Sequence, residues 1–113
     1  ALYLVHGPAR DQSGNPSAGT CTWSPYYCDA NQVCGQWCPE VDIMEANKHV
    51  FSSTPHKCDE PSLKGYYSSC DRTGCGRNTN KMGGDAYGPG RKYKIDTSRP
   101  FDVHTVFHGS GLD

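Results

Sequence analysis

The chain has 113 residues, a formal net charge of −1 at pH 7 and seven cysteines. A net charge so close to zero argues against nucleic-acid binding, which usually requires a basic surface, and no apolar run is long enough to span a membrane. Seven cysteines in so short a chain are typical of secreted, disulfide-bonded proteins and not of cytosolic ones.

Five segments show the alternation of apolar and polar residues, or the enrichment in β-branched and aromatic residues, that is typical of strands. They are residues 1–5, 40–45, 49–53, 91–96 and 102–108. Around the last segment, alternate residues from Phe101 to Phe107 share one face, which we expect to pack on a second sheet. With thirteen glycines, eight prolines and no sustained helical period, the sequence predicts a loop-rich, all-β fold with little helix.

Three carboxylates lie close together in the second of these segments, as Glu40, Asp42 and Glu45. Because side chains alternate between the two faces of a strand, Glu40 and Asp42 point the same way and the apolar residues between them point into a core. Strict alternation would send Glu45 to the core side. A β-bulge near Ile43 or Met44, a feature common beside active sites, would return Glu45 to the face of the other two acids.

Like charges on one surface raise the pKa of one carboxyl while another stays ionised. A retaining glycosidase requires such a pair, with one carboxylate as nucleophile and one carboxylic acid as proton donor about 5–5.5 Å apart. Two other interpretations stay open on these residues alone. One is a solvated strand face without a function, and the other is a magnesium or calcium site, which would need further oxygen ligands from elsewhere in the chain.

The run Glu40-Val-Asp-Ile-Met-Glu-Ala-Asn47, followed by Thr54-Pro-His-Lys-Cys58, resembles the active-site strand of glycoside hydrolase family 7, the fungal and protist cellulases. Other motifs of this family occur in the same order along nearly the whole chain. They are Ala-Leu-Tyr at residues 1–3, Tyr-Cys-Asp at 27–29, the two cysteines of 70–75, Tyr-Gly-Pro-Gly at 87–90 and Asp-Thr at 96–97. Each piece is short, but their common order makes the resemblance specific.

The resemblance implies roles for individual side chains. Glu40 corresponds to the nucleophile, Glu45 to the general acid/base, and Asp42 to the residue that hydrogen-bonds the nucleophile and tunes its protonation. His56 corresponds to a histidine beside the leaving group, where it could donate to a sugar hydroxyl, although a surface histidine without a role would explain it equally well. Substrate binding is expected at His56, Tyr3, Tyr27 and Asp29.

The resemblance also implies a fold and a partner. Members of the family fold as a concanavalin-like β-jelly-roll, a sandwich of two sheets whose concave sheet forms the substrate cleft, and their catalytic domains are several times longer than this chain. Residues 1–113 are thus expected to be part of such a domain, truncated at both ends. We expect a secreted monomer that acts on a β-glucan such as cellulose, with no metal or organic cofactor and no nucleic-acid or membrane partner.

The family pattern pairs Cys58 with Cys70 and gives Cys75 a partner beyond this chain. The other four cysteines would form two bridges beside the catalytic strand, with their connectivity left open: Cys21, Cys28, Cys34 and Cys38. A zinc site is the competing interpretation, although a paired C-x2-C knuckle is missing. Its ligands would be His56, Cys58, Cys70 and Cys75.

Some positions depart from the family pattern. The loop between Cys28 and Glu40 is much shorter than in family cellobiohydrolases, where an insertion helps to roof the cleft. Gly65, Thr73 and Gly76 stand where processive members carry charged product-site residues. Both departures predict an open groove and endo-acting cleavage of β-1,4-glucan. In addition, a tryptophan precedes Cys38, where the family often has a second cysteine.

Three alternatives stay open. Glycoside hydrolase family 16 shares the fold, the three-acid strand and the mechanism but acts on β-1,3 or mixed glucans and galactans, and the flanking motifs favour family 7 over it. A non-catalytic, lectin-like jelly roll would bind glucan without cleaving it. A small zinc-stapled interaction module would use the cysteines as metal ligands.

Overall fold

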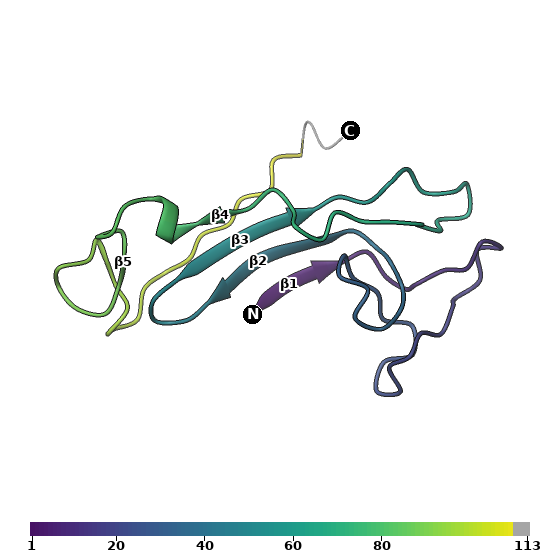
Figure 1. The fold of residues 1–113 in the computed structure, drawn as a ribbon, viewed down its shortest axis with the longest axis horizontal. Coiled ribbons are helices and arrows are strands. Elements are labelled where there is room, and N and C mark those ends of the chain that lie inside the picture. Colours follow the sequence, from purple (N-terminus) through teal and green to yellow (C-terminus); the bar gives the residue numbers. More distant parts are fainter. Residues whose placement is uncertain (110–113) are drawn as a thin grey trace.

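An antiparallel sheet flanked by long loops dominates the computed structural model, which describes residues 1–109 (Figure 1). The sheet has the order β1-β2-β3-β4, with β1 at Leu2–Val5, β2 at Glu40–Ala46, β3 at Phe51–His56 and β4 at Arg77–Asn78. A separate parallel pair is formed by β5 (Tyr87–Gly88) and β6 (Ile95–Asp96), and η1 (Thr79–Lys81) is the one helical turn among the described residues. No helix in this part of the chain is long and apolar enough to cross a membrane. The all-β prediction is confirmed, while the predicted domain end at residue 113 lies outside the described residues.

The hairpin between β2 and β3 is set by Asn47. Its side-chain oxygen accepts hydrogen bonds from the backbone N–H groups of His49 and Val50, at 2.8 and 3.1 Å, and such bonds favour a chain reversal. The turn occupies the first two residues of the strand predicted at 49–53. The strand exists, but its predicted bounds were wrong: β3 begins two residues later and extends to His56.

Two other predicted strands differ from the structure. Of residues 91–96, only β6 pairs with a neighbour, because a turn in which the Tyr93 N–H donates to the Gly90 carbonyl occupies the residues before it. The segment 102–108 forms no strand, although it runs alongside the sheet (Figure 1). The segment lies against the face of the sheet that carries Ile43 and Phe51, and alternation of apolar and polar residues does not form a strand without a neighbouring strand edge to pair with.

An apolar groove of about 490 Å³ lies between the C-terminal segment and the face of the sheet that carries Ile43 and Phe51. Tyr87 and Phe101 also line this groove and pack edge to face, with ring centroids 5.8 Å apart. Successive residues from Phe101 to Val106 line it, so the predicted alternating face does not form. The groove shows that Ile43 points away from the acids, as the strand pattern predicted.

The buried apolar residues are mainly cysteines and alanines. Cys28, Cys34 and Cys38 are the largest fully buried side chains of the described residues, whereas Trp23 and Leu63 are exposed. Disulfides therefore take over part of the role of a core. In the chain-entropy model, a bridge that closes a loop of about 15 residues stabilises a fold by about 3 kcal/mol.

Three disulfides fix the connectivity that the sequence left open. They are Cys21–Cys34, Cys28–Cys38 and Cys58–Cys70, and the third confirms the pairing that the family resemblance implied. Cys75 is exposed and unpaired. The competing zinc site is wrong, because two of its four ligands are bonded to each other. No group of three or more His, Cys, Asp and Glu side chains within residues 1–109 is placed to hold a metal ion.

Replacing Asp96 tests a carboxylate that orders the loop after β6. It accepts the Ser98 hydroxyl and N–H at 2.6 and 3.0 Å and the Gly90 N–H at 2.7 Å, and these donors lower the pKa of Asp96 to about 2. The stabilisation is present above the pKa of an unfolded aspartate, about 3.9, and is lost as the pH falls through about 2. We expect Asp96→Asn to lower the melting temperature clearly at neutral pH and much less in strong acid. Thermal unfolding followed by circular dichroism measures this, with the exposed Asp102→Asn as control, and an equal loss at both pH values would contradict it.

Candidate active site

A β-bulge in β2 brings the three acids to one face of the sheet. The register with β3 is Glu40 opposite His56, Asp42 opposite Thr54 and Glu45 opposite Ser52, with an irregularity between Asp42 and Glu45. Because paired residues share a face and every second residue of β3 points the same way, Glu45 lies on the side of Glu40 and Asp42. The predicted bulge is confirmed. We call this side the carboxylate face, which comprises Glu40, Asp42, Glu45, Ser52, Thr54 and His56.

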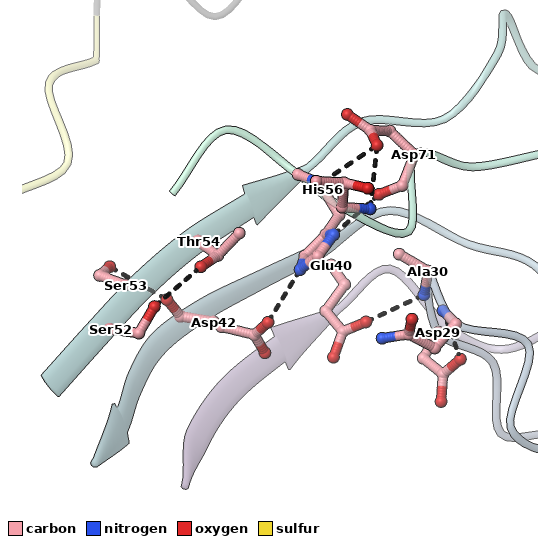
Figure 2. A network of polar contacts seen from close by, with 12 residues as sticks. Asp29, Ala30, Glu40, Asp42, Ser52, Ser53, Thr54, His56 and Asp71 are labelled. Atoms are coloured by element: carbon pink, nitrogen blue, oxygen red, sulfur yellow. Dashed lines mark hydrogen bonds and ion pairs between the residues drawn. The ribbon is translucent and has the colours of Figure 1, made fainter. Parts of the chain in front are cut away.

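Glu40 is buried at the start of β2, with 7% of its surface exposed. One of its carboxylate oxygens accepts the backbone N–H of Ala30 at 2.9 Å (Figure 2), because the Cys28–Cys38 disulfide folds the preceding loop back on the strand. Burial raises the pKa of Glu40; the Ala30 N–H works against this, and the negative charges of Asp42 and Asp29 add to it. Nothing in the sequence pointed to the Ala30 N–H, since it is a backbone group.

His56 is held between two oxygen atoms. Its Nδ1 lies 2.8 Å from the Asp71 carbonyl oxygen and its Nε2 lies 3.0 Å from an Asp42 carboxylate oxygen (Figure 2). A carbonyl oxygen can only accept, so Nδ1 carries a proton, and the contact between Nε2 and Asp42 needs a second one. Burial lowers the pKa of His56, but the hydrogen bonds to Asp71 and Asp42 outweigh burial and raise it. This arrangement favours an imidazolium that donates to the Asp42 carboxylate, and the two side chains have 5% and 8% of their surfaces exposed.

The Asp71 carbonyl was not foreseen from the sequence, because it too is a backbone group. The Asp71 N–H donates to the Lys57 carbonyl at 2.8 Å, beside the Cys58–Cys70 disulfide, so the loop folds back over the end of β3. Gly74 has a φ of 68° and packs against His56, where a Cβ would lie 2.8 Å from Nδ1. The C-x4-C motif with its glycine was the signal that could have pointed to this loop.

Tyr3 and Tyr27 lie beside the carboxylates. Tyr3 pairs with Asp42 across β1 and β2 and so shares the carboxylate face. The Tyr27 hydroxyl donates to the Tyr3 hydroxyl at 3.3 Å. Burial, the contact with Tyr3 and the negative charge of Asp29 raise the pKa of Tyr27, so its hydroxyl stays protonated. Both rings lie next to the acids, and sugar binding by them stays a prediction.

Asp29 and Glu45 have opposite surroundings. Asp29 is only 3% exposed, and its carboxylate accepts the N–H groups of Asn31 and Val33 at 2.9 and 3.1 Å, which stabilises the turn before β2. Sugar binding by Asp29 stays a prediction. Glu45 is exposed beyond the bulge, where a bound ligand can reach its carboxyl group.

Two carboxyls of one face thus have different environments. Glu40 is buried, accepts a backbone N–H and has a raised pKa, whereas Glu45 is exposed on the other side of the bulge. Such a difference allows two acids in one site to take different chemical roles. The sequence did not show which carboxyl would have the raised pKa, because burial and neighbouring charges decide it.

Comparison with known proteins gives a consistent result. The family model described as glycosyl hydrolase family 7 matches residues 12–112. The chain is 34% identical to endoglucanase type C of Fusarium oxysporum and 32% identical to endoglucanase 1 of Humicola insolens, over 95% of its length in both cases. A solved endoglucanase I complexed with cellobiose superposes with a TM-score of 0.58, at 30% identity and over 86% of the chain. The Humicola insolens endocellulase EGI gives 0.56, at 26% identity and over 86%.

These matches cover only part of each relative. The chain spans 30% of the Fusarium endoglucanase and 32% of the Humicola endoglucanase 1, and it spans 30% of each of the two solved chains. The resemblance that the motifs indicated is confirmed. The predicted fold class is also confirmed, since the similar solved structures are β-jelly-roll cellulases.

Replacing Asp42 by asparagine tests the buried ion pair. The change removes a charge that favours the protonated His56 and disfavours the ionised Glu40, so we expect the pKa of both groups to fall. NMR titration of the histidine ring and the glutamate carboxyl signals measures both. Asp71→Asn is the matched control, because Asp71 contacts His56 through its carbonyl and an asparagine side chain can still accept the two loop N–H groups. An unchanged His56 pKa in Asp42→Asn, or an equal fall in the control, would contradict the ion pair.

Proposed function

The chain belongs to glycosyl hydrolase family 7, and on that basis we propose that it carries the catalytic strand of an enzyme that hydrolyses β-1,4-glucosidic bonds in cellulose or a related β-glucan, with retention of configuration. The observation that carries the proposal is the bulge in β2, which puts Glu40, Asp42 and Glu45 on one face. The names of the relatives, endoglucanases and an endoglucanase complexed with cellobiose, support a glucan substrate.

In the proposed reaction, Glu40 attacks the anomeric carbon while Glu45 protonates the glycosidic oxygen. In the second step Glu45 takes a proton from a water molecule, and the water oxygen attacks the anomeric carbon. This attack releases Glu40 from the glycosyl ester and restores the original configuration. Glu40 must be ionised to attack, although burial and the Asp42 charge disfavour its ionised form. The ester bond removes the charge of Glu40, so the repulsion from Asp42 falls along the reaction and the barrier is lower.

Asp42 and His56 are proposed to tune the nucleophile. The His56 imidazolium balances the charge of Asp42, and without it two neighbouring carboxylates in buried surroundings would compete to hold one proton. Because both ring nitrogens of His56 already have oxygen partners, a sugar hydroxyl would have to displace one of them. We therefore propose that the main role of His56 is to balance the charge of Asp42, and that sugar binding is a secondary role.

Cleavage is proposed to occur within the glucan chain. The short segment between Cys28 and Glu40 is closed by a disulfide and lies at one end of the sheet (Figure 1), which supports an open groove. An open groove admits internal segments of a polysaccharide. The membership in family 7 favours β-1,4-glucan over the β-1,3-glucans of family 16. Three disulfides support an extracellular location, and we expect a monomer that needs no cofactor.

The chain's three glutamates provide a test with an internal control. We expect Glu40→Gln to abolish hydrolysis of carboxymethyl-cellulose, and Glu45→Gln to lower kcat by about 10²- to 10⁴-fold, the usual contribution of general acid/base catalysis. Glu60→Gln, in an exposed loop, should leave activity unchanged. New reducing ends and viscosity are measured on the chain and on a chimera, in which the chain replaces the segment of the Fusarium endoglucanase that it matches.

The first-formed anomer distinguishes the mechanisms. NMR of the product should show the β-anomer at early times, as retention requires. Activity on β-1,3-glucan alone would contradict the proposed β-1,4-glucan substrate and favour the substrate class of family 16. Glucan binding without cleavage in the wild-type chimera would leave a lectin-like jelly roll as the better account.

The pH dependence tests the charges around the nucleophile. Asp29→Asn removes a negative charge that raises the pKa of Glu40, while an asparagine oxygen can still accept the two N–H groups of the turn. Glu40 then ionises at lower pH, so the acid limb of the kcat/KM profile should move to lower pH. Asp85→Asn, an exposed aspartate outside the site, should leave the limb in place. A limb that moves to higher pH in Asp29→Asn contradicts the assignment.

A further inference from the structure

A cation–π contact joins the loop that packs on His56 to the segment just before β2. The Arg72 guanidinium carbon lies 5.1 Å from the centroid of the Trp37 ring. Arg72 directly follows Asp71, whose carbonyl oxygen holds His56, and Trp37 lies three residues before Glu40. The contact therefore connects the two parts of the chain that position the buried ion pair, and neither of its residues belongs to the three-acid motif.

Trp37 is a firm anchor for this contact. Its ring is half-buried, and its backbone forms a parallel bridge with Asp29. The N–H of the next residue, Cys38, donates to the Asp29 carbonyl at 3.2 Å, and Cys38 is bonded to Cys28. An arginine that stacks on this ring is thus restrained relative to β2.

The loop between Cys70 and Cys75, which carries Asp71, makes backbone hydrogen bonds to β3 and to Lys57, the residue that follows β3. The Asp71 N–H donates to the Lys57 carbonyl at 2.8 Å and the Cys75 N–H to the Pro55 carbonyl at 3.0 Å. His56, in contrast, must meet an oxygen of this loop and an oxygen of β2 at the same time. Contacts to β3 place the loop relative to β2 only indirectly, through the pairing of the two strands. The contact between Arg72 and Trp37 spans the distance between the loop and the segment just before β2.

We propose that Arg72 and Trp37 are positioning residues, which hold the Asp71 carbonyl against His56 and so keep the imidazole on Asp42. The expected effect is modest, because an exposed cation–π contact changes an equilibrium roughly two- to fivefold. The consequence for catalysis rests on the proposed function, whereas the placement of His56 can be measured without any activity.

The direct readout is the Nδ1 proton of His56, in the chain labelled with ¹⁵N-histidine and with His56 assigned from His56→Gln. Arg72→Ala and Trp37→Ala should each make this proton exchange with water roughly two- to fivefold faster. Each should also lower the pKa of His56, because the Asp71 hydrogen bond favours the imidazolium. The double variant should be no worse than either single one, since both remove the same contact.

Conservative variants and a matched control separate positioning from general loss of structure. Arg72→Lys keeps a cation and Trp37→Phe keeps an aromatic face, so both should restore part of the protection. Lys92→Ala removes another cation–π contact, in which the Lys92 ammonium lies 5.0 Å from the Tyr93 ring centroid. That variant should leave the His56 proton unchanged.

Each outcome decides for or against the proposal. The proposal is overturned if the His56 proton exchanges at the wild-type rate in both alanine variants. It is also overturned if the effects of Arg72→Ala and Trp37→Ala add in the double variant. A Lys92→Ala effect as large as that of Arg72→Ala would overturn it as well. If the wild-type chimera hydrolyses glucan, Arg72→Ala should lower kcat with little change in KM. If that chimera is inactive, the proposed function fails, while the exchange data still decide the positioning.

Discussion

Strand β2 is the element on which the rest of the structure depends, because it is hydrogen-bonded along both edges. Its pairing with β1 and β3 sets which residues share a face, and a one-residue slip would turn every acid to the opposite side. The bulge after Asp42 is the one irregularity that lets Glu45 join Glu40. The carboxylate face is therefore a consequence of strand register, and the surrounding loops add to it without creating it.

The charges on this face are balanced by groups from outside β2. Three acids near one another repel. A backbone N–H donates a hydrogen bond to Glu40, and His56 pairs with Asp42, and both contacts offset this repulsion. Both compensating groups are positioned by disulfide-closed loops, through Cys28–Cys38 and Cys58–Cys70. The disulfides thus serve the site as well as the stability of a chain with a small core.

The candidate site could be predicted in part. The identity of the acids, their spacing and the bulge followed from the alternation rule applied to residues 40–45, and the family resemblance followed from the order of short motifs. The hydrogen bonds of the Ala30 N–H and the Asp71 carbonyl could not be predicted, because backbone groups have no sequence signature. The failure of the strand predicted at 102–108 has a similar cause, since a strand requires a partner edge that its own sequence does not specify.

The sequence by itself determined the features whose cause is local, which are the alternating strand with its acids and the loop-rich character, and it also indicated the family. Only the tertiary structure decided how Cys21, Cys28, Cys34 and Cys38 pair, that hydrogen bonds raise the pKa of His56, and that burial raises the pKa of Glu40. These properties depend on burial and on contacts between residues far apart in the chain. A protonation state reflects the energy of a charge in its surroundings, and those surroundings exist only once the loops have folded over the sheet.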